Sequence, residues 1–380
     1  MNRSIIQESG KQTPYYAYDI SVLKQTIDRA RVEANRYDYH IHYALKANST
    51  EPIVREMLHA GFGVDCVSGQ EMELALAQGF KSTQIAFAGV GKTDWEIDNA
   101  INSGIFTLNV ESIEELIVIE ERAKSLGKHA NVALRINPDV NARTHHYITT
   151  GLEENKFGIS SWMFDRLFET LGKCNHIEFK GLHFHIGSQI RDLEPFRNLC
   201  TRINHLQGVF IDHGYFPSHI NAGGVLGVDY DDPDSSSNPD FEAFFGLFDT
   251  YLDLHPSQTL HFELGRSLVA NCGDLISKIV FVKEGQKTNF LILDAGMTEL
   301  IRPALYQAFH KIENIEAVSG VNYPYDVVGP ICESSDCFGK AVMLPESRRG
   351  ELVAIRSAGA YGECMANGYN MRTLNPSMFY

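Results

Sequence analysis

Hydrophobic and polar positions follow a repeating pattern from about residue 40 to residue 265. Short apolar runs alternate with longer stretches in which apolar residues recur at helical spacing. The runs occupy residues 40–45, 63–67, 85–89, 106–110, 131–136, 181–186, 218–223 and 260–264. Eight strands that alternate with helices predict a TIM (β/α)8 barrel. A doubly wound open sheet remains the alternative on this pattern alone.

Capping signals support the helices of this pattern. Ser68 and Glu71 form a capping box before a helix that should stop at Gly79, and Ser112 and Glu115 repeat the signature. In such a box the serine side chain and the glutamate satisfy backbone N–H groups of the first helical turn. We therefore expect helices to begin directly after both serines.

The pattern changes after about residue 268. Apolar runs at 275–282, 290–296, 325–332 and 351–359 are broken by Gly and Pro and lack helical spacing. They predict a second, β-rich domain at the C-terminal end of the chain. The predicted division assigns residues 20–267 to the barrel, and 1–19 with 268–380 to the β-rich domain. The polar stretch 229–240 is predicted to be a loop. Its aspartates resemble a calcium loop, but the glycine at the turning position is missing, so no metal is predicted there.

Composition narrows the classes of function. A chain of 380 residues exceeds the usual size of one hydrophobic core, in line with two domains. The net charge of −15 argues against a nucleic-acid partner, and no apolar run is long enough to predict a membrane span. The seven cysteines have no regular spacing and are interpreted as free thiols. Together with the lack of an apolar leader, they predict a cytoplasmic protein.

Reactive residues cluster at the predicted C-terminal ends of the barrel strands, where TIM barrels place their active sites. They are Lys46, Asp65, Arg135, His185, Ser188, Gly223, Gly224, Glu263, Gly265 and Arg266. This set fits pyridoxal 5′-phosphate (PLP). A lysine amine can bond the cofactor's aldehyde, glycine backbone N–H groups can bind its phosphate, and a carboxylate can pair with its ring nitrogen. His183 and His185 share one face of a strand, but a third ligand at suitable spacing is lacking, so no metal is predicted.

Several longer motifs resemble one family. HYALKAN, GLHFHIGSQ, ELGR, DAGMTELIRPALYQAFH, VVGPICESSD and AGAYG span residues 42 to 362. They resemble, in order, the signatures of the diaminopimelate decarboxylases, which belong to the alanine racemase-like PLP enzymes. The family's barrel and β-domain agree with the strand count.

The resemblance implies a role for each matching residue at the cofactor. Lys46 forms the covalent link to PLP, Asp65 and Arg135 support it, and His185 stacks on the ring. Glu263 pairs with the ring nitrogen. The phosphate is expected to lie among Ser188, Gly223, Gly224, Gly265, Arg266 and Tyr361.

The resemblance also implies substrate-binding residues and a homodimer. Arg266, Arg302, Tyr306 and Tyr361 are expected to bind the substrate and its distal carboxylate. Cys332 is expected to be the proton donor, and Glu333 and Ser334 to bind the distal ammonium; these three come from the other subunit of the dimer. An ion pair between Lys156 and Asp336 across that interface is a further expectation from the related decarboxylases.

Two positions depart from the family pattern. A third glycine is usual after Gly223 and Gly224, but this chain has Val225. The substitution leaves open how tightly the loop binds phosphate. Leu264 stands where the family commonly has proline, and the charged positions on either side of it are kept.

The implied reaction is the decarboxylation of meso-diaminopimelate to L-lysine, the last step of lysine biosynthesis. One alternative is a related decarboxylase acting on ornithine, arginine or carboxynorspermidine. Another is a non-catalytic binding protein on the same scaffold, although such proteins lose the lysine or the cysteine. A PLP racemase is a third, which needs a two-base site and carries different motifs.

Overall fold

The structure is a computed structural model of the 380-residue chain, and it describes residues 1–140, 156–224, 226–235, 239–317 and 320–380. The chain forms two compact units. The barrel unit comprises Ile27–Gly227 and Asp240–Gly265, and the sheet unit comprises Met1–Thr26, Val228–Pro239 and Arg266–Tyr380. Residues 20–26, 228–239 and 266–267 thus lie in the sheet unit, unlike in the predicted division.

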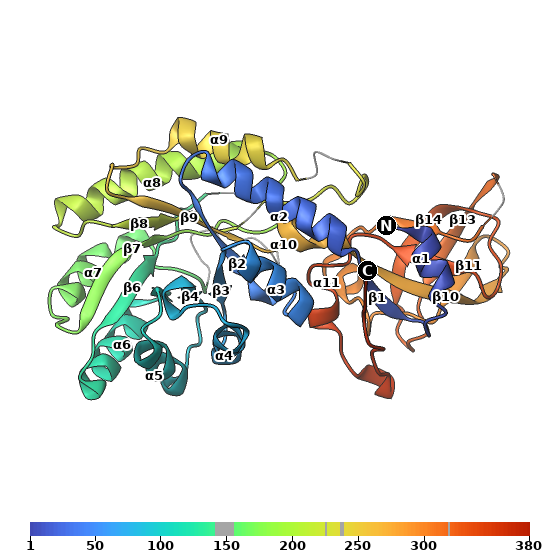
Figure 1. The fold of residues 1–380 in the computed structure, drawn as a ribbon, viewed down its shortest axis with the longest axis horizontal. Helices are drawn as coiled ribbons and strands as arrows, with labels where there is room; N and C mark the ends of the chain where they lie inside the picture. Colours follow the sequence, from blue (N-terminus) through green and yellow to red (C-terminus); the bar gives the residue numbers. More distant parts are fainter. Residues whose placement is uncertain (141–155, 225, 236–238, 318–319) are drawn as a thin grey trace. The chain divides into compact units, whose positions relative to one another are not determined.

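The barrel unit is a closed barrel of eight parallel strands (Figure 1). The strands lie in chain order, and the last pairs with the first, with Ile41 opposite Phe262. They are β2 (His40–Ala44), β3 (Gly63–Cys66), β4 (Ile85–Phe87), β5 (Thr107–Val110), β6 (Ala130–Arg135), β7 (Ile177–His183), β8 (His219–Asn221) and β9 (Thr259–Leu264). The predicted TIM barrel is confirmed, and the open sheet is wrong.

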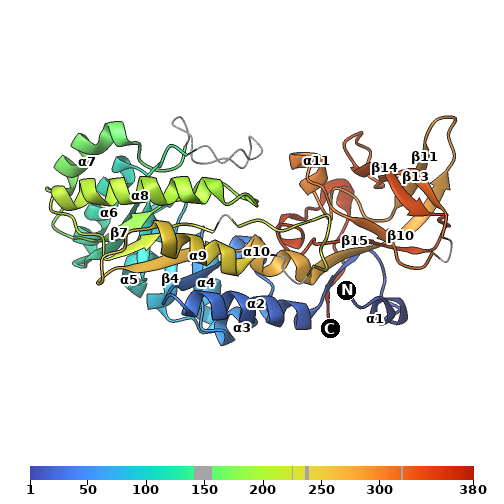
Figure 2. The same ribbon diagram turned by 90° about the horizontal axis from the view of Figure 1, so that it is seen from above.

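Helices connect and cover these strands, as Figure 2 shows from above. They are α3 (Glu51–His59), α4 (Gly69–Gln78), α5 (Asp94–Ser103), α6 (Ile113–Leu126), α7 (Phe164–Leu171), α8 (Glu194–Asp212) and α9 (Phe241–Tyr251); α2 (Ile20–Asn35) runs from the sheet unit into the barrel unit. The Ser68 and Ser112 side chains accept hydrogen bonds from Glu71 N at 3.2 Å and Glu115 N at 3.1 Å. Both predicted N-caps are confirmed.

The sheet unit is built on an eight-stranded mixed sheet. Its strands are β1 (Tyr15–Tyr18), β10 (Gly273–Lys283), β11 (Asn289–Leu293), β12 (Ile312–Asn314), β13 (Asn322–Val328), β14 (Cys337–Pro345), β15 (Leu352–Ile355) and β16 (Met378–Phe379). Short helices accompany the sheet, namely α1 (Arg3–Glu8), α10 (Arg266–Val269) and α11 (Arg302–Tyr306). The predicted β-rich second domain is confirmed.

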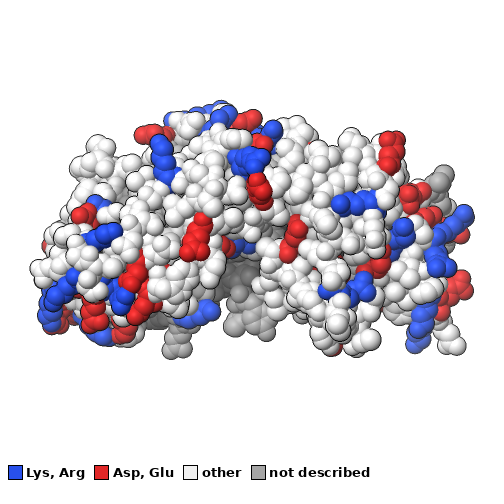
Figure 3. All heavy atoms as spheres, turned by 60° about the horizontal axis from the view of Figure 1, so that its bottom comes forward, with Lys and Arg blue, Asp and Glu red and all other residues white. Residues whose placement is uncertain are grey.

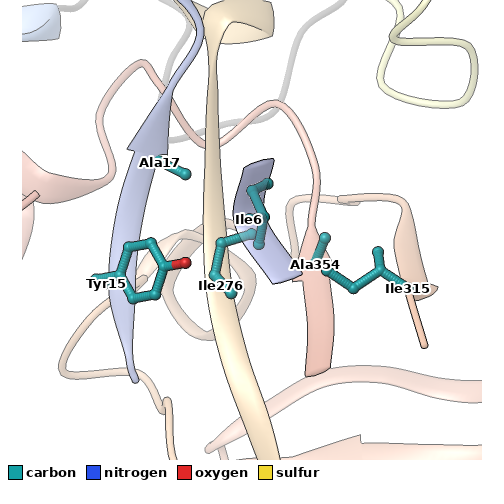
Figure 4. Packing of buried hydrophobic residues seen from close by; sticks show 6 residues of the cluster. All are labelled: Ile6, Tyr15, Ala17, Ile276, Ile315 and Ala354. Atoms are coloured by element: carbon teal, nitrogen blue, oxygen red, sulfur yellow. The ribbon is translucent and has the colours of Figure 1, made fainter. Parts of the chain in front are cut away.

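The N-terminal strand is an inner strand of this sheet. β1 pairs antiparallel with β10, with Tyr15 opposite Ile276, and parallel with β16, with Ala17 opposite Met378. Figure 4 shows the apolar cluster beside it, which gathers Ile6, Tyr15, Ala17, Ile276, Ile315 and Ala354. All six are at least 95% buried, so segments from both ends of the chain share one core.

Charges of both signs are interspersed on the face shown in Figure 3, where lysine and arginine side chains lie among aspartate and glutamate. Within the described ranges, none of the helices is both long and apolar enough to cross a membrane. The seven cysteines are free thiols.

Candidate active site

The C-terminal ends of the barrel strands surround a cavity of about 430 Å³. It is lined by Lys46, Val67, Phe87–Lys92, Glu96, Arg135, Phe157, His183, His185 and Glu263. Four residues predicted for the site therefore lie around one cavity: Lys46, Arg135, His185 and Glu263. The barrel geometry explains this, because parallel strands bring their C-terminal ends to the same rim.

Lys46 lies in a single 3-10 turn, Leu45–Ala47, that directly follows β2. Its Nζ donates a hydrogen bond to Asp65 Oδ2 at 2.7 Å, and its side chain is one-third exposed to the cavity solvent. Asp65 is fully buried; burial and the nearby charge of Glu263 raise the pKa of its carboxyl, and Lys46 opposes that rise. The pair thus keeps a lysine amine in place where a ligand can reach it.

Glu263 is held by three side chains from other strands. Its Oε1 accepts hydrogen bonds from Asn221 Nδ2 at 2.7 Å and Asn109 Nδ2 at 3.2 Å, and its Oε2 lies 3.1 Å from His183 Nε2. Burial alone would raise the pKa of Glu263, but His183 and the charge of Lys46 hold it well below its usual range. The cavity therefore contains a carboxylate that stays ionised although it is buried.

Arg135 and His185 also belong to the polar lining. Arg135 Nη1 donates to Glu111 Oε1 at 2.7 Å, and its guanidinium lies 4.7 Å from the Phe157 ring centroid. Burial and the positive charges of Arg135 and Lys46 lower the pKa of His185 well below 6.5. His185 is consequently a neutral, flat ring in the cavity wall.

Asn109, Asn221 and Glu111 are not among the residues predicted from the sequence, and His183 is named there only in connection with a metal. A signal was available for the two asparagines, since each is a polar residue inside a short, otherwise apolar strand. Such a position in a barrel strand indicates a side chain that must find buried partners. In the part of the chain that the structure describes, no group of three or more His, Cys, Asp or Glu side chains could hold a metal ion.

The glycines after β8 are required by close backbone packing. Gly223 has φ +74°, and a Cβ there would lie 2.6 Å from the Phe184 carbonyl oxygen. A Cβ at Gly224 would lie 1.2 Å from the Glu263 carbonyl oxygen. Side chains are therefore excluded at both positions, whether or not a phosphate binds there. Val225 lies outside the described residues.

Two more predicted positions lie in the barrel unit near the cavity-forming strand ends. A Cβ at Gly265, just after β9, would lie 3.0 Å from the Ala47 Cβ beside Lys46. Glycine therefore lets the end of β9 approach the turn that carries the lysine. Ser188 follows β7 and is half-buried.

The predicted carboxylate-binding residues lie in the sheet unit. Arg266 opens α10, and Arg302 and Tyr306 are the first and last residues of α11. Nη1 of Arg266 and Nη1 of Arg302 donate to the same oxygen, the Tyr230 hydroxyl, at 2.8 Å and 2.9 Å. The Arg266 guanidinium also lies 4.8 Å from the ring centroid of Tyr361, whose φ is +55°. The structure brings both arginines together.

The predicted donor segment is on the surface of the sheet unit. Cys332, Glu333 and Ser334 are exposed, and Glu333 accepts a hydrogen bond from the Tyr369 hydroxyl at 2.8 Å. Asp336 is buried and accepts from Met297 N at 2.6 Å and Ile331 N at 2.7 Å. These backbone partners account for its burial within one chain. Lys156 is exposed, and the ion pair with Asp336 stays a prediction.

The donor set of the cavity fits PLP. Asp65 Oδ1 is fully buried and has no hydrogen-bond partner among the described residues, so one more donor can be accepted beside Lys46. A lysine amine, an ionised carboxylate and a neutral imidazole around one cavity of a closed barrel define an enzyme of the kind that holds an aldehyde cofactor with a ring nitrogen.

Comparison with known proteins agrees with that class. Residues 22–270 match the sequence family described as pyridoxal-dependent decarboxylase, pyridoxal binding domain. Diaminopimelate decarboxylase of Bacteroides thetaiotaomicron is 54% identical over 96% of this chain and 94% of its own length. The Helicobacter pylori enzyme of that name is 41% identical, over 95% of this chain and 88% of its own. The chain belongs to the diaminopimelate decarboxylase family.

The fold comparison gives the same result. The crystal structure of the Helicobacter pylori diaminopimelate decarboxylase complexed with L-lysine superposes with a TM-score of 0.90 at 38% sequence identity. The match covers 98% of this chain and 93% of that one. The family resemblance read from the motifs is confirmed over nearly the whole chain.

Proposed function

We propose that this protein decarboxylates meso-diaminopimelate to L-lysine and CO2 with PLP as its cofactor. The observation that carries the proposal is the cavity in which Lys46 and an ionised Glu263 lie together at the strand ends. The names of the relatives support the substrate.

The cavity residues would hold the cofactor at distinct points. Lys46 would bond its aldehyde carbon, Glu263 would pair with its ring nitrogen, and the neutral ring of His185 would stack on its face. Ser188, Gly223, Gly224, Gly265, Arg266 and Tyr361 would hold its phosphate. Bound there, PLP would supply a protonated ring that accepts the electron pair released when CO2 leaves.

The protein's own groups set up this chemistry. The Glu263 carboxylate keeps a proton on the ring nitrogen, because its negative charge is fixed by Asn109, Asn221 and His183. Asp65 keeps the Lys46 amine in position, and Arg135 is immobilised by Glu111. The Cys332 thiol donates the proton that replaces the lost carboxylate.

Substrate selection depends on the sheet-unit residues. Arg266, Arg302, Tyr306 and Tyr361 bind the carboxylate that the reaction leaves in place, because guanidinium groups bind carboxylates bidentately. Precursors of diamines carry no such carboxylate, so this pair argues against ornithine or arginine as the substrate. Lys46 and Cys332 are both present, which argues against a non-catalytic binding protein.

We also propose a homodimer with shared active sites, in which Cys332, Glu333 and Ser334 serve the site of the other subunit. Their exposure on the sheet unit supports this role. The cytoplasm remains the predicted compartment, supported by seven free cysteines.

The proposal is tested by incubating the PLP-loaded protein with meso-diaminopimelate and measuring L-lysine and CO2. We expect turnover of this substrate and little turnover of ornithine or arginine.

Borohydride reduction followed by peptide mapping should place the cofactor on Lys46. Lys92 lines the same cavity but is buried, with its Nζ bonded to two carbonyl oxygens and to Glu115, so it is the internal control. A label on Lys92, or faster release of CO2 from ornithine, contradicts the proposal.

A further inference from the structure

The Tyr230 hydroxyl lies between two arginines. It accepts from Arg266 Nη1 at 2.8 Å and from Arg302 Nη1 at 2.9 Å. Tyr230 belongs to Val228–Pro239, a segment of the sheet unit whose described residues, 228–235 and 239, lie outside the helices and strands. All three side chains are more than 90% buried. Burial of two like charges beside each other is unfavourable unless a group between them accepts from both.

The electrostatics show that Tyr230 is that group. Burial would raise the pKa of the Tyr230 hydroxyl, but the charges of Arg266 and Arg302 outweigh it and lower the pKa. In turn, burial and the charge of Arg266 lower the pKa of the Arg302 guanidinium, whereas Tyr230 acts to raise it. Tyr230 therefore offsets the repulsion that would otherwise separate the two guanidinium groups.

The Tyr230 ring is fixed by its surroundings. It meets the His310 ring edge to face, with centroids 4.9 Å apart at 71°. The guanidinium carbon of Arg302 lies 5.1 Å from the Tyr230 ring centroid. Contacts on two sides make the tyrosine part of the packed interior, so its hydroxyl is held at one point.

His310 determines which edge of Arg302 is left for a ligand. His310 Nδ1 donates to the Arg356 carbonyl oxygen at 2.8 Å, so Nε2, which lies 2.8 Å from Arg302 Nη1, accepts. Burial and the charge of Arg302 lower the pKa of His310 to about 3, in agreement with a neutral ring. Both hydrogens of Arg302 Nη1 are thus used, one by His310 and one by Tyr230.

The other edge of the guanidinium consists of Nε and Nη2. Nε of Arg302 is buried and has no hydrogen-bond partner within the described part of the chain. A buried donor of this kind is rarely left without an acceptor in a working protein. Two parallel N–H groups on one guanidinium edge match the two oxygens of a carboxylate.

We propose that Tyr230 is a positioning residue for the substrate's second carboxylate: by accepting from both arginines, it turns Arg302 so that the Nε–Nη2 edge is presented to that carboxylate. The inference deepens the proposed function and rests on it. The alternative hypothesis is that the hydroxyl occupies the position of the carboxylate and must move away before substrate binds. The two hypotheses predict opposite changes in the Kd of lysine when the hydroxyl is removed.

The test uses Tyr230→Phe, which keeps the ring and removes the oxygen. L-Lysine retains the second carboxylate, and pentane-1,5-diamine is lysine without it, so both are titrated into the PLP-loaded protein. We expect the Kd of lysine to rise about tenfold or more, because two hydrogen bonds from charged donors are lost. The Kd of the diamine should stay within about twofold of the wild-type value. With diaminopimelate, KM should rise more than kcat falls.

The matched control is Tyr15→Phe. Tyr15 is a buried tyrosine of the same unit whose hydroxyl lies 3.3 Å from Ser9 Oγ. This variant should bind both ligands like the wild type. If Tyr230→Phe binds lysine as tightly as the wild type or more tightly, Tyr230 either blocks the carboxylate position or has no role in binding, and the inference is wrong. Equal losses for lysine and diamine would also contradict it.

A second variant covers the case in which Tyr230→Phe does not fold. Placing 3,5-difluorotyrosine at position 230 nearly preserves the shape and lowers the pKa of the phenol, so that near neutral pH more of it is phenolate, whose negative charge attracts both arginines. If Tyr230 positions Arg302, lysine should bind this variant at least as tightly as the wild type. If the hydroxyl blocks the carboxylate position, lysine should bind more weakly. Absence of diaminopimelate turnover by the wild-type protein would refute the proposed function. The lysine and diamine titrations test the role of Tyr230 separately, so failure of one hypothesis can be distinguished from failure of the other.

Discussion

The Glu263 carboxylate is held by side chains from three directions, and its Oε2, which has one of the three partners, can accept a further hydrogen bond. Asn109 comes from β5, His183 from β7 and Asn221 from β8, and each contributes a nitrogen to one carboxylate on β9. Since these strands belong to one closed barrel, the four side chains cannot move independently. The negative charge is therefore preorganised, as the proposed pairing with a protonated ring nitrogen requires.

Replacing Glu263 with glutamine tests the value of that charge. Glu263→Gln keeps the size but removes the anion, so the ring nitrogen of PLP is no longer held protonated. We expect kcat to fall by about a hundredfold or more, on the scale of losing one preorganised electrostatic contact. PLP should remain bound through Lys46, which absorbance spectra can verify.

The control for this prediction is Glu120→Gln. Glu120 is a carboxylate of the same barrel unit that bonds His176 instead of lining the cavity. Its replacement should leave kcat within about twofold of the wild-type value. Normal turnover by Glu263→Gln would show that the ring nitrogen needs no anionic partner here.

The sequence predicts some of these residues and not others, for physical reasons. Lys46 and Glu263 are predictable because each follows or ends an apolar run, and strand ends meet at one rim of a barrel. Asn109 and Asn221 leave a local signal, as polar residues within buried strands. Tyr230 leaves none, because its partners lie 36 and 72 residues away and their meeting depends on the path of an irregular segment.

At the scale of elements, β2, β8 and β9 carry a second cluster of histidines away from the cavity lining. His42 Nε2 lies 2.9 Å from His261 Nδ1. The ring centroid of Phe106 lies 4.8 Å from that of His219 and 5.0 Å from that of His261. Burial is the largest cause that lowers the pKa of His42 to about 4 and that of His219 to about 3. The pKa of His261 is also lowered well below 6.5. The strands thus bury these imidazoles in the neutral form.

The burial of neutral histidines predicts sensitivity to acid. In the unfolded chain a histidine binds a proton near pH 6.5, whereas His42 and His219 in the folded protein do so only near pH 4 and pH 3. Their stabilising contribution is therefore complete above about pH 6.5 and is lost as the pH falls toward 4. As the pH falls through that window, each of these histidines reduces the free energy of unfolding by up to about 1.4 kcal/mol for every pH unit.

Urea unfolding of His219→Phe between pH 7 and pH 4.5 measures this effect. Phenylalanine keeps an aromatic ring beside Phe106 and cannot be protonated, so the free energy of unfolding should fall less steeply with acid than in the wild type. The exposed His59 provides the matched control, and His59→Phe should follow the wild-type slope. Identical slopes for all three proteins would exclude His219 as a source of acid sensitivity.

At the scale of the whole molecule, the chain passes between the two units four times, after Thr26, Gly227, Pro239 and Gly265. The sheet unit is consequently assembled from three separate segments. Val228–Pro239, which supplies Tyr230, interrupts the barrel sequence between β8 and α9. The residues proposed to bind the substrate carboxylate and those proposed to bind the cofactor thus alternate along the chain.

The proposed division of labour between subunits gives a prediction at this scale. A Lys46→Ala variant and a Cys332→Ala variant are each expected to be inactive. Mixed and reassociated, they should recover up to about a quarter of wild-type activity, because half of the dimers are mixed and one of their two sites regains both groups.

A different pair serves as the control. Lys46 and Glu263 lie in the same barrel unit, so mixing Lys46→Ala with Glu263→Gln should restore nothing. Failure of the first mixture in purified mixed dimers would show that Cys332 serves its own subunit.

The position of β1 between β10 and β16 has a consequence for the nascent chain. Tyr15–Tyr18 is synthesised long before its two neighbours in the sheet, which begin at Gly273 and Met378. Until β10 has been made, this apolar strand has both edges unpaired, and such edges readily pair with other chains. A chain that stops before Met378 would leave one edge of β1 without its partner. The sheet can therefore close on both sides of β1 only after β16 has been made.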